Sequence, residues 1–278
     1  MKKLLAAIIV LALAGCTGVG NQASSEQINI GILQIVDHPA LDAARNGFIN
    51  GLAEEGWVEG EDVVFHPFSA QGDISNANAM AQRIVDMQVD MILGIATPTS
   101  QTLANTTETI PIVITAVTDP LRAGLIESFE RPGTNVTGTS DLTPVTQQFQ
   151  LLMRLLPDAQ TVGIMYNAGE VNSAIQADMA REAAVALGLD YIAGVAPSTA
   201  DVASVIESII DRVDVIYIPT CNTMATAYTT INDCRRTRHS CYSRGRRCYT
   251  SGCACYRRYQ LLSARPSNCC NGCPNFTR

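Results

Sequence analysis

The chain has 278 residues with a formal net charge of −7, and 47% of its residues are hydrophobic. That length suits one large or two medium domains, and this share of apolar residues is enough to form their cores. The composition therefore excludes an intrinsically disordered protein and indicates a globular one.

The first fifteen residues have the pattern of a signal peptide. Lys2 and Lys3 precede an apolar run over 4–13, which is too short for a stable membrane span. Leu-Ala-Gly-Cys, ending at Cys16, then resembles a bacterial lipobox, in which cleavage leaves the cysteine as a lipidated N-terminus; the alternative is a plain signal peptide with a chance cysteine. Residues 16–27 have the composition of a polar tether. We expect a cell-envelope protein anchored through Cys16, on the periplasmic or extracellular face.

Strands and helices alternate over residues 28–138, which we assign to a first lobe. Apolar runs and helical patterns predict, in order, a strand at 28–36, helix 40–55, strand 63–68, helix 73–87, strand 91–96, a helix from Thr97 and strand 111–117. This alternation predicts an α/β fold with a parallel, doubly wound sheet.

The pattern restarts after a turn-rich segment at 131–138 and a short strand at 136–139, which we interpret as a crossing into a second unit. The predicted elements that follow are helix 144–156, strand 161–166, helix 171–187, strand 191–195, helix 199–212, strand 213–218 and helix 222–232. We assign 139–233 to a second Rossmann-like α/β lobe. A cleft between two lobes is a favoured place for a ligand.

The most informative segment is Met91 to Thr102. A strand-length apolar run is followed by Thr97-Pro98-Thr99-Ser100, which predicts a helix start with Thr97 as the N-cap and proline at the first helical position. Free backbone N–H groups and the helix dipole at such a start favour a small anionic group such as a carboxylate. The alternative is an ordinary strand-to-helix turn.

Polar residues follow the carboxyl ends of the other strands as well, where ligands bind to open α/β sheets. Asp119 or Glu170 can face an ammonium group, and the remaining residues offer hydrogen bonds. Alternatively, Thr97, Asn172 and Thr220 are caps and His38 is a loop histidine without a ligand. The candidate ligand-binding residues are His38, Thr97, Thr99, Ser100, Thr118, Asp119, Tyr166, Asn167, Glu170, Asn172, Ser173, Thr220 and Asn222.

The last 45 residues differ sharply in composition from the rest. Residues 234–278 hold ten Arg, eight of the ten Cys and no acidic residue, so 1–233, with nine basic and 26 acidic residues, carry −17. A disulfide knot, a Cys-rich metal site and residues never selected to fold are three interpretations. No second CxxC lies at the interval of a zinc ribbon or finger, and we predict no metal or cofactor.

We favour the third interpretation of this tail. Permissible codons for Cys234 to Tyr249, shifted by one base, read Val-Ala-Glu-His-Gly-Ile-Pro-Val-Ile-Ala-Gly-Glu-Glu-Gly-Val. This shifted text is a helix end, a turn and a buried strand, which the preceding pattern requires next. The hypothesis is therefore that the reading frame slips near Asp233.

Two other classes of function use similar lobes, because fold does not fix function. The first is an extracytoplasmic enzyme acting on a small metabolite. The lobes, however, contain no dinucleotide fingerprint, P-loop, Gly-x-Ser-x-Gly or His-Glu-x-x-His, and only His38 is placed to act as a general base. The second is a sensor, which needs a DNA-binding segment where this chain has a lipobox. Export likewise argues against nucleic acid as a partner of the Arg-rich tail.

Several motifs in order carry a family resemblance. They are the lipobox, Gly31-Ile-Leu-Gln-Ile-Val-Asp-His-Pro-Ala-Leu-Asp42, Ala96-Thr-Pro-Thr-Ser100, Ala116-Val-Thr-Asp-Pro120, Gly138-Thr-Ser-Asp141 and Pro219-Thr-Cys-Asn-Thr223. From Cys16 to about Asp233 the chain resembles the ABC transporter substrate-binding lipoproteins of the tryptophan/tyrosine-uptake type. The resemblance implies a type I periplasmic-binding-protein fold, in which two hinged lobes close on a ligand and deliver it to a membrane permease. We expect a monomer.

The resemblance also implies roles for residues. Hydroxyl and backbone donors at Thr97, Thr99, Ser100 and Thr118 would hold the carboxylate of an amino acid, and the second lobe would contribute Tyr166, Asn167, Glu170 and Asn222. The family usually has Asp where this chain has Cys221, which removes a charged partner for a ligand amine. Beyond Asp233 we expect the resemblance to end and the last part of the second lobe to be missing or scrambled, which would make the protein unstable.

Overall fold

The computed structural model describes residues 27–237. The predicted signal peptide, the lipidation site at Cys16 and most of the Cys/Arg-rich tail lie outside these residues. Within 27–237, no helix is both long enough and apolar enough to cross a membrane.

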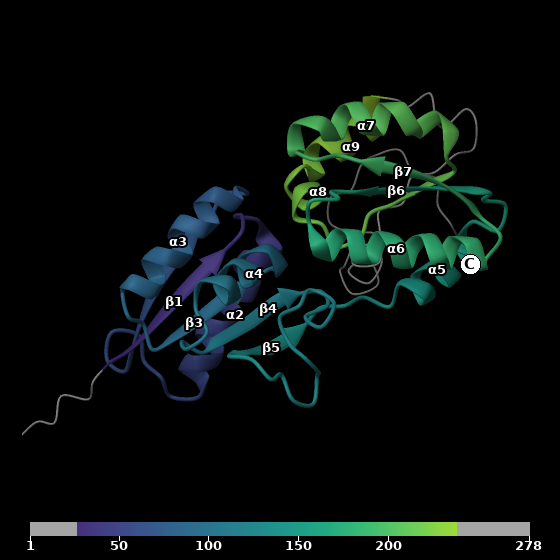
Figure 1. Ribbon diagram of the computed structural model, residues 1–278. Helices are drawn as coiled ribbons and strands as arrows, with labels where there is room; N and C mark the ends of the chain where they lie inside the picture. The colour runs from purple at the N-terminus through teal and green to yellow at the C-terminus, as the bar shows by residue number, and fades with distance from the viewer. Residues whose placement is uncertain (1–26, 238–278) are drawn as a thin grey trace, which may run out of the picture.

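The first lobe is a five-stranded sheet with helices on both faces (Figure 1). Its elements are β1 (Ile28–Gln34), α2 (Pro39–Glu54), β2 (Val63–Ser69), α3 (Ile74–Asp86), β3 (Met91–Ile95), α4 (Thr97–Thr106), β4 (Ile112–Val117) and β5 (Val136–Ser140). The strand order is β2-β1-β3-β4-β5, and every neighbouring pair is parallel. The predicted parallel α/β sheet is confirmed.

Side chains of the first lobe alternate between two cores, as expected for strands with both faces covered. Leu33 and Ile92 are fully buried on the side of α3 and α4. Ile32 and Leu93 are fully buried on the other side, where Leu41 of α2 packs. Burial on two faces explains why these strands are apolar runs in the sequence.

The second lobe is a smaller parallel sheet in the order β7-β6-β8. Its elements are α5 (Val145–Leu155), β6 (Thr161–Tyr166), α6 (Val171–Ala186), β7 (Asp190–Val195), η1 (Thr199–Asp201), α7 (Val202–Ile209), η2 (Ile210–Arg212), β8 (Val215–Tyr217), α8 (Asn222–Thr226) and α9 (Tyr228–Thr237). Helices α5 and α6 share a core with one face of the sheet, and α7, α8 and α9 share a core with the other.

The structure differs from the predicted elements mainly at their ends and in the last third. The single helix expected over 199–212 consists of a short α-helix between two 3-10 turns. The helix expected over 222–232 is two helices, because the chain leaves helical geometry at Ala227. Helix α9 continues past Asp233 to Thr237, and Cys234 packs against the core of the second lobe.

The boundary between the lobes also differs in detail. Residues 136–139, expected to cross into a second unit, belong to β5, which extends to Ser140 as the edge strand of the first sheet. The chain passes to the second lobe between β5 and α5 (Figure 1). The lobes are in contact: Thr118 Oγ1 and Thr220 Oγ1 are 2.9 Å apart, and Val171 packs against the core of the first lobe.

Candidate ligand-binding site

The candidate site in the first lobe begins where β3 and β4 end. Ala96 follows β3 with a φ of 79°, and Ala116 near the end of β4 has a φ of 54°. Such backbone is sparsely populated by residues with a Cβ and costs on the order of 1–3 kcal/mol, and strained positions of this kind cluster at ligand and active sites. Neighbours hold Ala96 in place, since its N–H donates to Thr115 and its carbonyl accepts from Ser100 N.

The start of α4 corrects one expectation. The N-cap is Ala96, which has no capping side chain, and the predicted cap Thr97 is the first residue of the helix. Thr99 Oγ1 donates to the carbonyl oxygens of Ile95 at 2.5 Å and Ala96 at 3.1 Å, and Ser100 Oγ donates to Ala96 O at 2.8 Å. These two hydroxyls therefore brace the strained turn. Thr97 Oγ1 is buried and has no hydrogen-bond partner among the described residues.

His38 stands at the other end of the first-lobe site, after β1. It is the N-cap residue of α2, and its half-buried imidazole has an Nε2 atom without a partner in the described part of the chain. Burial lowers the pKa of His38. A hydrogen bond with the side chain of Asn222 and the charges of Asp42 and Glu170 act in the opposite direction. The ring is therefore neutral at pH 7. Because Asn222 and Glu170 belong to the second lobe, His38 faces across the gap between the lobes.

Thr118 and Asp119 complete the first-lobe set. The hydroxyl of Thr118 meets that of Thr220, which makes this pair a direct bridge between the lobes. Asp119 is buried, and its Oδ1 accepts from Arg122 N at 3.0 Å, so part of its carboxylate stabilises the turn that follows β4.

Glu170 organises the second-lobe set. Its carboxylate accepts from Asn222 N and Nδ2, both at 2.8 Å, and from Thr223 N at 2.8 Å and Oγ1 at 2.7 Å. Asn172 Nδ2 lies at 3.4 Å and Cys221 Sγ at 3.5 Å. The carboxylate thus satisfies the free N–H groups at the start of α8. With donors of its own lobe already around both oxygens, Glu170 acts as a helix cap.

The other second-lobe residues surround this cap. Asn167 donates to Thr223 Oγ1 at 2.9 Å, and its own N–H donates to Ser173 Oγ at 3.3 Å. Asn172 Nδ2 donates to Thr220 O at 2.8 Å, whereas its Oδ1 is buried without a partner among the described residues. Tyr166, at the end of β6, packs against the core shared with α5 and α6.

Cys221 lies inside this cluster. It is buried, and burial, with the charge of Glu170 as the second cause, raises the pKa of its thiol to about 12. The side chain is therefore neutral at physiological pH. An Asp at this position would place a second carboxylate beside Glu170, so this chain carries less negative charge here than the family pattern implies.

Two residues next to the Thr118–Thr220 contact were not predicted from the sequence. The residue Asp141 is exposed, yet desolvation of its carboxyl group raises its pKa, and Thr118 opposes this through a hydrogen bond. Gln176 is fully buried; it donates to Thr143 Oγ1 at 3.1 Å and accepts from Thr220 N at 2.8 Å. Asp141 could have been found, because it ends the Gly138-Thr-Ser-Asp141 motif. Gln176 lies in the middle of α6, and no sequence pattern around it indicates a role in the site.

A cavity of about 390 Å³ also lies between the lobes, beside α3 and α4. It contains none of the thirteen predicted site residues. Its lining is Ile74, Asn78, Pro98, Gln101, Thr102, Ala104, Asn105, Ala123, Gly124, Leu125, Gly169 and Val171. Among residues 27–237, no three His, Cys, Asp or Glu side chains are grouped so that they could hold a metal ion.

Comparison with known proteins decides the family. The family described as ABC transporter substrate binding protein matches residues 29–253. The chain belongs to this family. The match of this substrate-binding protein continues past Asp233, where we expected the resemblance to end. The family consists of binding proteins of ABC transporters and not of enzymes.

The substrate-binding protein has relatives with known names and structures. It is 37% identical over 245 residues to a tyrosine-binding protein of Clostridioides difficile (strain R20291), covering 83% of this chain and 71% of that protein. A domain from Streptococcus pneumonia in complex with L-Trp is 35% identical, with a TM-score of 0.76 over 82% of this chain and 75% of that one. These neighbours confirm the type I periplasmic-binding-protein fold.

A third relative has been solved without ligand and in an open state. The ligand-free, open structure of a substrate-binding protein with adhesive properties from Clostridium difficile is 38% identical, and covers 76% of this chain and 71% of its own. Its TM-score is only 0.55. At similar sequence identity, the structure of this chain is therefore more similar to the L-Trp complex than to the open, ligand-free relative, as judged by the two TM-scores.

Proposed function

We propose that this protein is the substrate-binding lipoprotein of an ABC importer and captures an amino acid with an aromatic side chain between its lobes. The observation that carries the proposal is the meeting of polar residues from both lobes at the Thr118–Thr220 contact. Relatives named for tyrosine and crystallised with L-Trp, at 37% and 35% identity, supply the ligand class. The greater similarity to the L-Trp complex than to the open relative supports a closed arrangement of the lobes.

The groups that hold the ligand's carboxylate come from the start of α4. The Thr97 hydroxyl has no other partner in residues 27–237, and the first N–H groups of α4 are free of helical bonds by geometry. The helix dipole adds to their attraction for negative charge. Thr99 and Ser100 contribute indirectly, because their hydroxyls hold the turn that presents these donors.

Acceptors on the other side of the site receive the ligand's ammonium group. Asn172 Oδ1 and His38 Nε2 are buried atoms without protein partners in the described residues, and a neutral imidazole can accept at Nε2. Asp119, which directly follows Thr118 after β4, supplies a carboxylate from the first lobe. Glu170 contributes by holding Asn222 in place rather than by pairing with the ligand.

Delivery to a membrane permease and attachment through the lipid on Cys16 complete the proposed role. Members of the family work outside the cytoplasm, which agrees with the signal-peptide pattern of the first residues. We propose that the protein acts as a monomer, because the ligand is enclosed by the two lobes of one chain.

The test is isothermal titration of residues 17–278 with L-Trp and L-Tyr. Indole-3-propionate, which lacks the ammonium group, and tryptamine, which lacks the carboxylate, serve as matched controls. We expect at least one amino acid to bind and both controls to bind at least about tenfold more weakly, since each removes partners of buried polar groups. Binding of neither amino acid, or equal binding of the controls, would overturn the proposal.

A further inference from the structure

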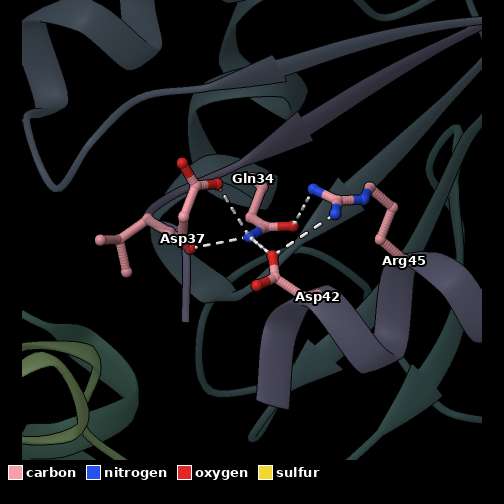
Figure 2. A network of polar contacts seen from close by, with 5 residues as sticks. Gln34, Asp37, Asp42 and Arg45 are labelled. Atoms are coloured by element: carbon pink, nitrogen blue, oxygen red, sulfur yellow. Dashed lines mark hydrogen bonds and ion pairs between the residues drawn. The ribbon is translucent and has the colours of Figure 1, made fainter. Parts of the chain in front are cut away.

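Gln34 is the centre of a polar network at the end of β1 (Figure 2). Its Nε2 donates to Val36 O at 2.8 Å and to Asp42 Oδ1 at 2.9 Å, with Asp37 Oδ1 at 3.3 Å. Its Oε1 accepts from Arg45 Nη1 at 3.3 Å. The side chain is fully buried, so these protein groups replace water as its partners.

The network fixes which way the amide points. Arg45 supplies a donor on one side, and the carboxylates of Asp42 and Asp37 supply acceptors on the other (Figure 2). Arg45 and Asp42 are also within 3.5 Å of each other as an ion pair. A side chain with one donor end and one acceptor end therefore fits here in one orientation only.

This arrangement connects the central part of the sheet to the start of α2. Gln34 pairs with Ser69 of β2 and Ile95 of β3, so it is held from both sides. From this position its Nε2 donates to the carbonyl of Val36 and the carboxylate of Asp42, and these two residues lie on either side of His38 in the chain. The backbone N–H of Asp42 in turn donates to His38 O at 3.0 Å.

We propose that Gln34 is a positioning residue that sets the place of His38 in the ligand site. The proposal rests on the proposed function, because it gives His38 a role toward the ligand. The loop between β1 and α2 is also held by Gly72 N, which donates to Ile35 O at 2.7 Å, but the bonds of Gln34 to Val36 O and Asp37 Oδ1 are the ones that hold the two residues directly before His38. The charged and polar groups that face the imidazole are Asp42 of α2 and Asn222 and Glu170 of the second lobe.

The test uses Gln34→Met, which keeps the length and buried volume of the side chain but removes its donors and acceptor. The matched control is Asn135→Leu. Asn135 Nδ2 donates to Thr107 O at 3.0 Å and Ile110 O at 2.8 Å, which makes it an amide that braces the loop between α4 and β4. Neither residue belongs to the proposed ligand contacts.

The first readout is the pKa of His38 by NMR in the ligand-free protein, with the imidazole signal assigned through His38→Asn. Loss of the Gln34 bonds frees the loop, which lessens the burial of the imidazole, and it removes the Gln34 donor from the carboxylates of Asp37 and Asp42, although Asp42 keeps its ion pair with Arg45. Both effects raise the pKa of His38 in Gln34→Met. The control leaves it unchanged. An unchanged pKa of His38 in Gln34→Met would overturn the proposal, whatever the variant does to stability.

The second readout is the affinity for L-Trp and L-Tyr between pH 5.5 and pH 8. We expect Gln34→Met to bind about tenfold more weakly than the wild type at pH 7, and Asn135→Leu to bind equally well. Equal losses in both variants would mean that Gln34 only stabilises the lobe, which contradicts the proposal. If the wild type binds neither amino acid, the proposed function fails, while the NMR titration still decides the role of Gln34.

Discussion

Replacing Glu170 by Gln separates two roles for this carboxylate, a cap of α8 and a partner of the ligand's ammonium group. Four strong donors converge on Glu170, from the backbone and side chains of Asn222 and Thr223. Gln keeps one of the two acceptor oxygens and replaces the other with an NH₂ group, which then faces the N–H and O–H donors of Asn222 and Thr223. At least one bond to a charged acceptor is lost and one donor is left facing another.

The expected loss follows from these contacts. A hydrogen bond to a charged group contributes about 1.5–3 kcal/mol, and an unsatisfied buried donor costs about 1–3 kcal/mol. We expect Glu170→Gln to lower the free energy of unfolding by about 3 kcal/mol, near the lower end of the sum of these two contributions. Glu207→Gln is the matched control, because Glu207 is an exposed residue of α7 in the same lobe.

Urea denaturation followed by two probes measures this loss and shows which lobe it affects. Far-UV circular dichroism follows the whole chain, while fluorescence of Trp57, the chain's single tryptophan, reports on the first lobe. The circular dichroism transition should move to lower urea in Glu170→Gln and stay in place in Glu207→Gln. A variant with unchanged stability that no longer binds its amino acid would refute the capping argument and assign Glu170 to the ammonium group.

Four further predictions address the bridge, the strained turn, pH and the gene. Thr118→Val removes the hydroxyl bridge between the lobes, so ligand affinity should fall about fivefold, the value of one neutral hydrogen bond; a Thr106→Val control should bind normally. Ala96→Gly relieves backbone strain at a φ of 79° and should raise the free energy of unfolding by roughly 1 kcal/mol in thermal melts; a lower melting temperature would contradict this. The folded-state pKa of His38 is lowered, so its contribution to stability is complete above its unfolded value of 6.5 and is lost as pH falls from there through the folded pKa; this loss should be absent in His38→Asn. Resequencing the gene should find a one-base slip near codon 233, and an intact frame through Arg278 in independent reads would end that hypothesis.

Periodicity was sufficient to predict the lobes, because their strands are buried on both faces. Ile32 and Leu33 face opposite cores and are both fully buried, so β1 is an apolar run rather than an alternating one. The cap of α4 could not be predicted in this way. Thr97 has the chemistry of a cap, yet the left-handed backbone of Ala96 makes the preceding residue the cap, and nothing in an alanine indicates a positive φ.

The roles within the site depend on contacts between distant parts of the chain. Glu170 meets the start of α8 52 residues later, and no local pattern predicts this pairing. Sequence reasoning could name both segments, because each follows a strand, but could not tell that one satisfies the other. Gln34 offered a weak signal, since it is the polar residue within the apolar run from Gly31 to Val36.

The two polar networks lie each within a single lobe, and this has a consequence for the speed of capture. The bonds of Gln34 join residues of the first lobe, and those of Glu170 join residues of the second. Each half of the site is therefore assembled before the lobes meet. On the proposed function, an incoming molecule would not need to order side chains on either surface, so the entropy lost on association would be mainly that of the ligand and of one rigid-body movement. On the proposed function, encounter with either half would then be productive, and the residence time would be set by how often the lobes part.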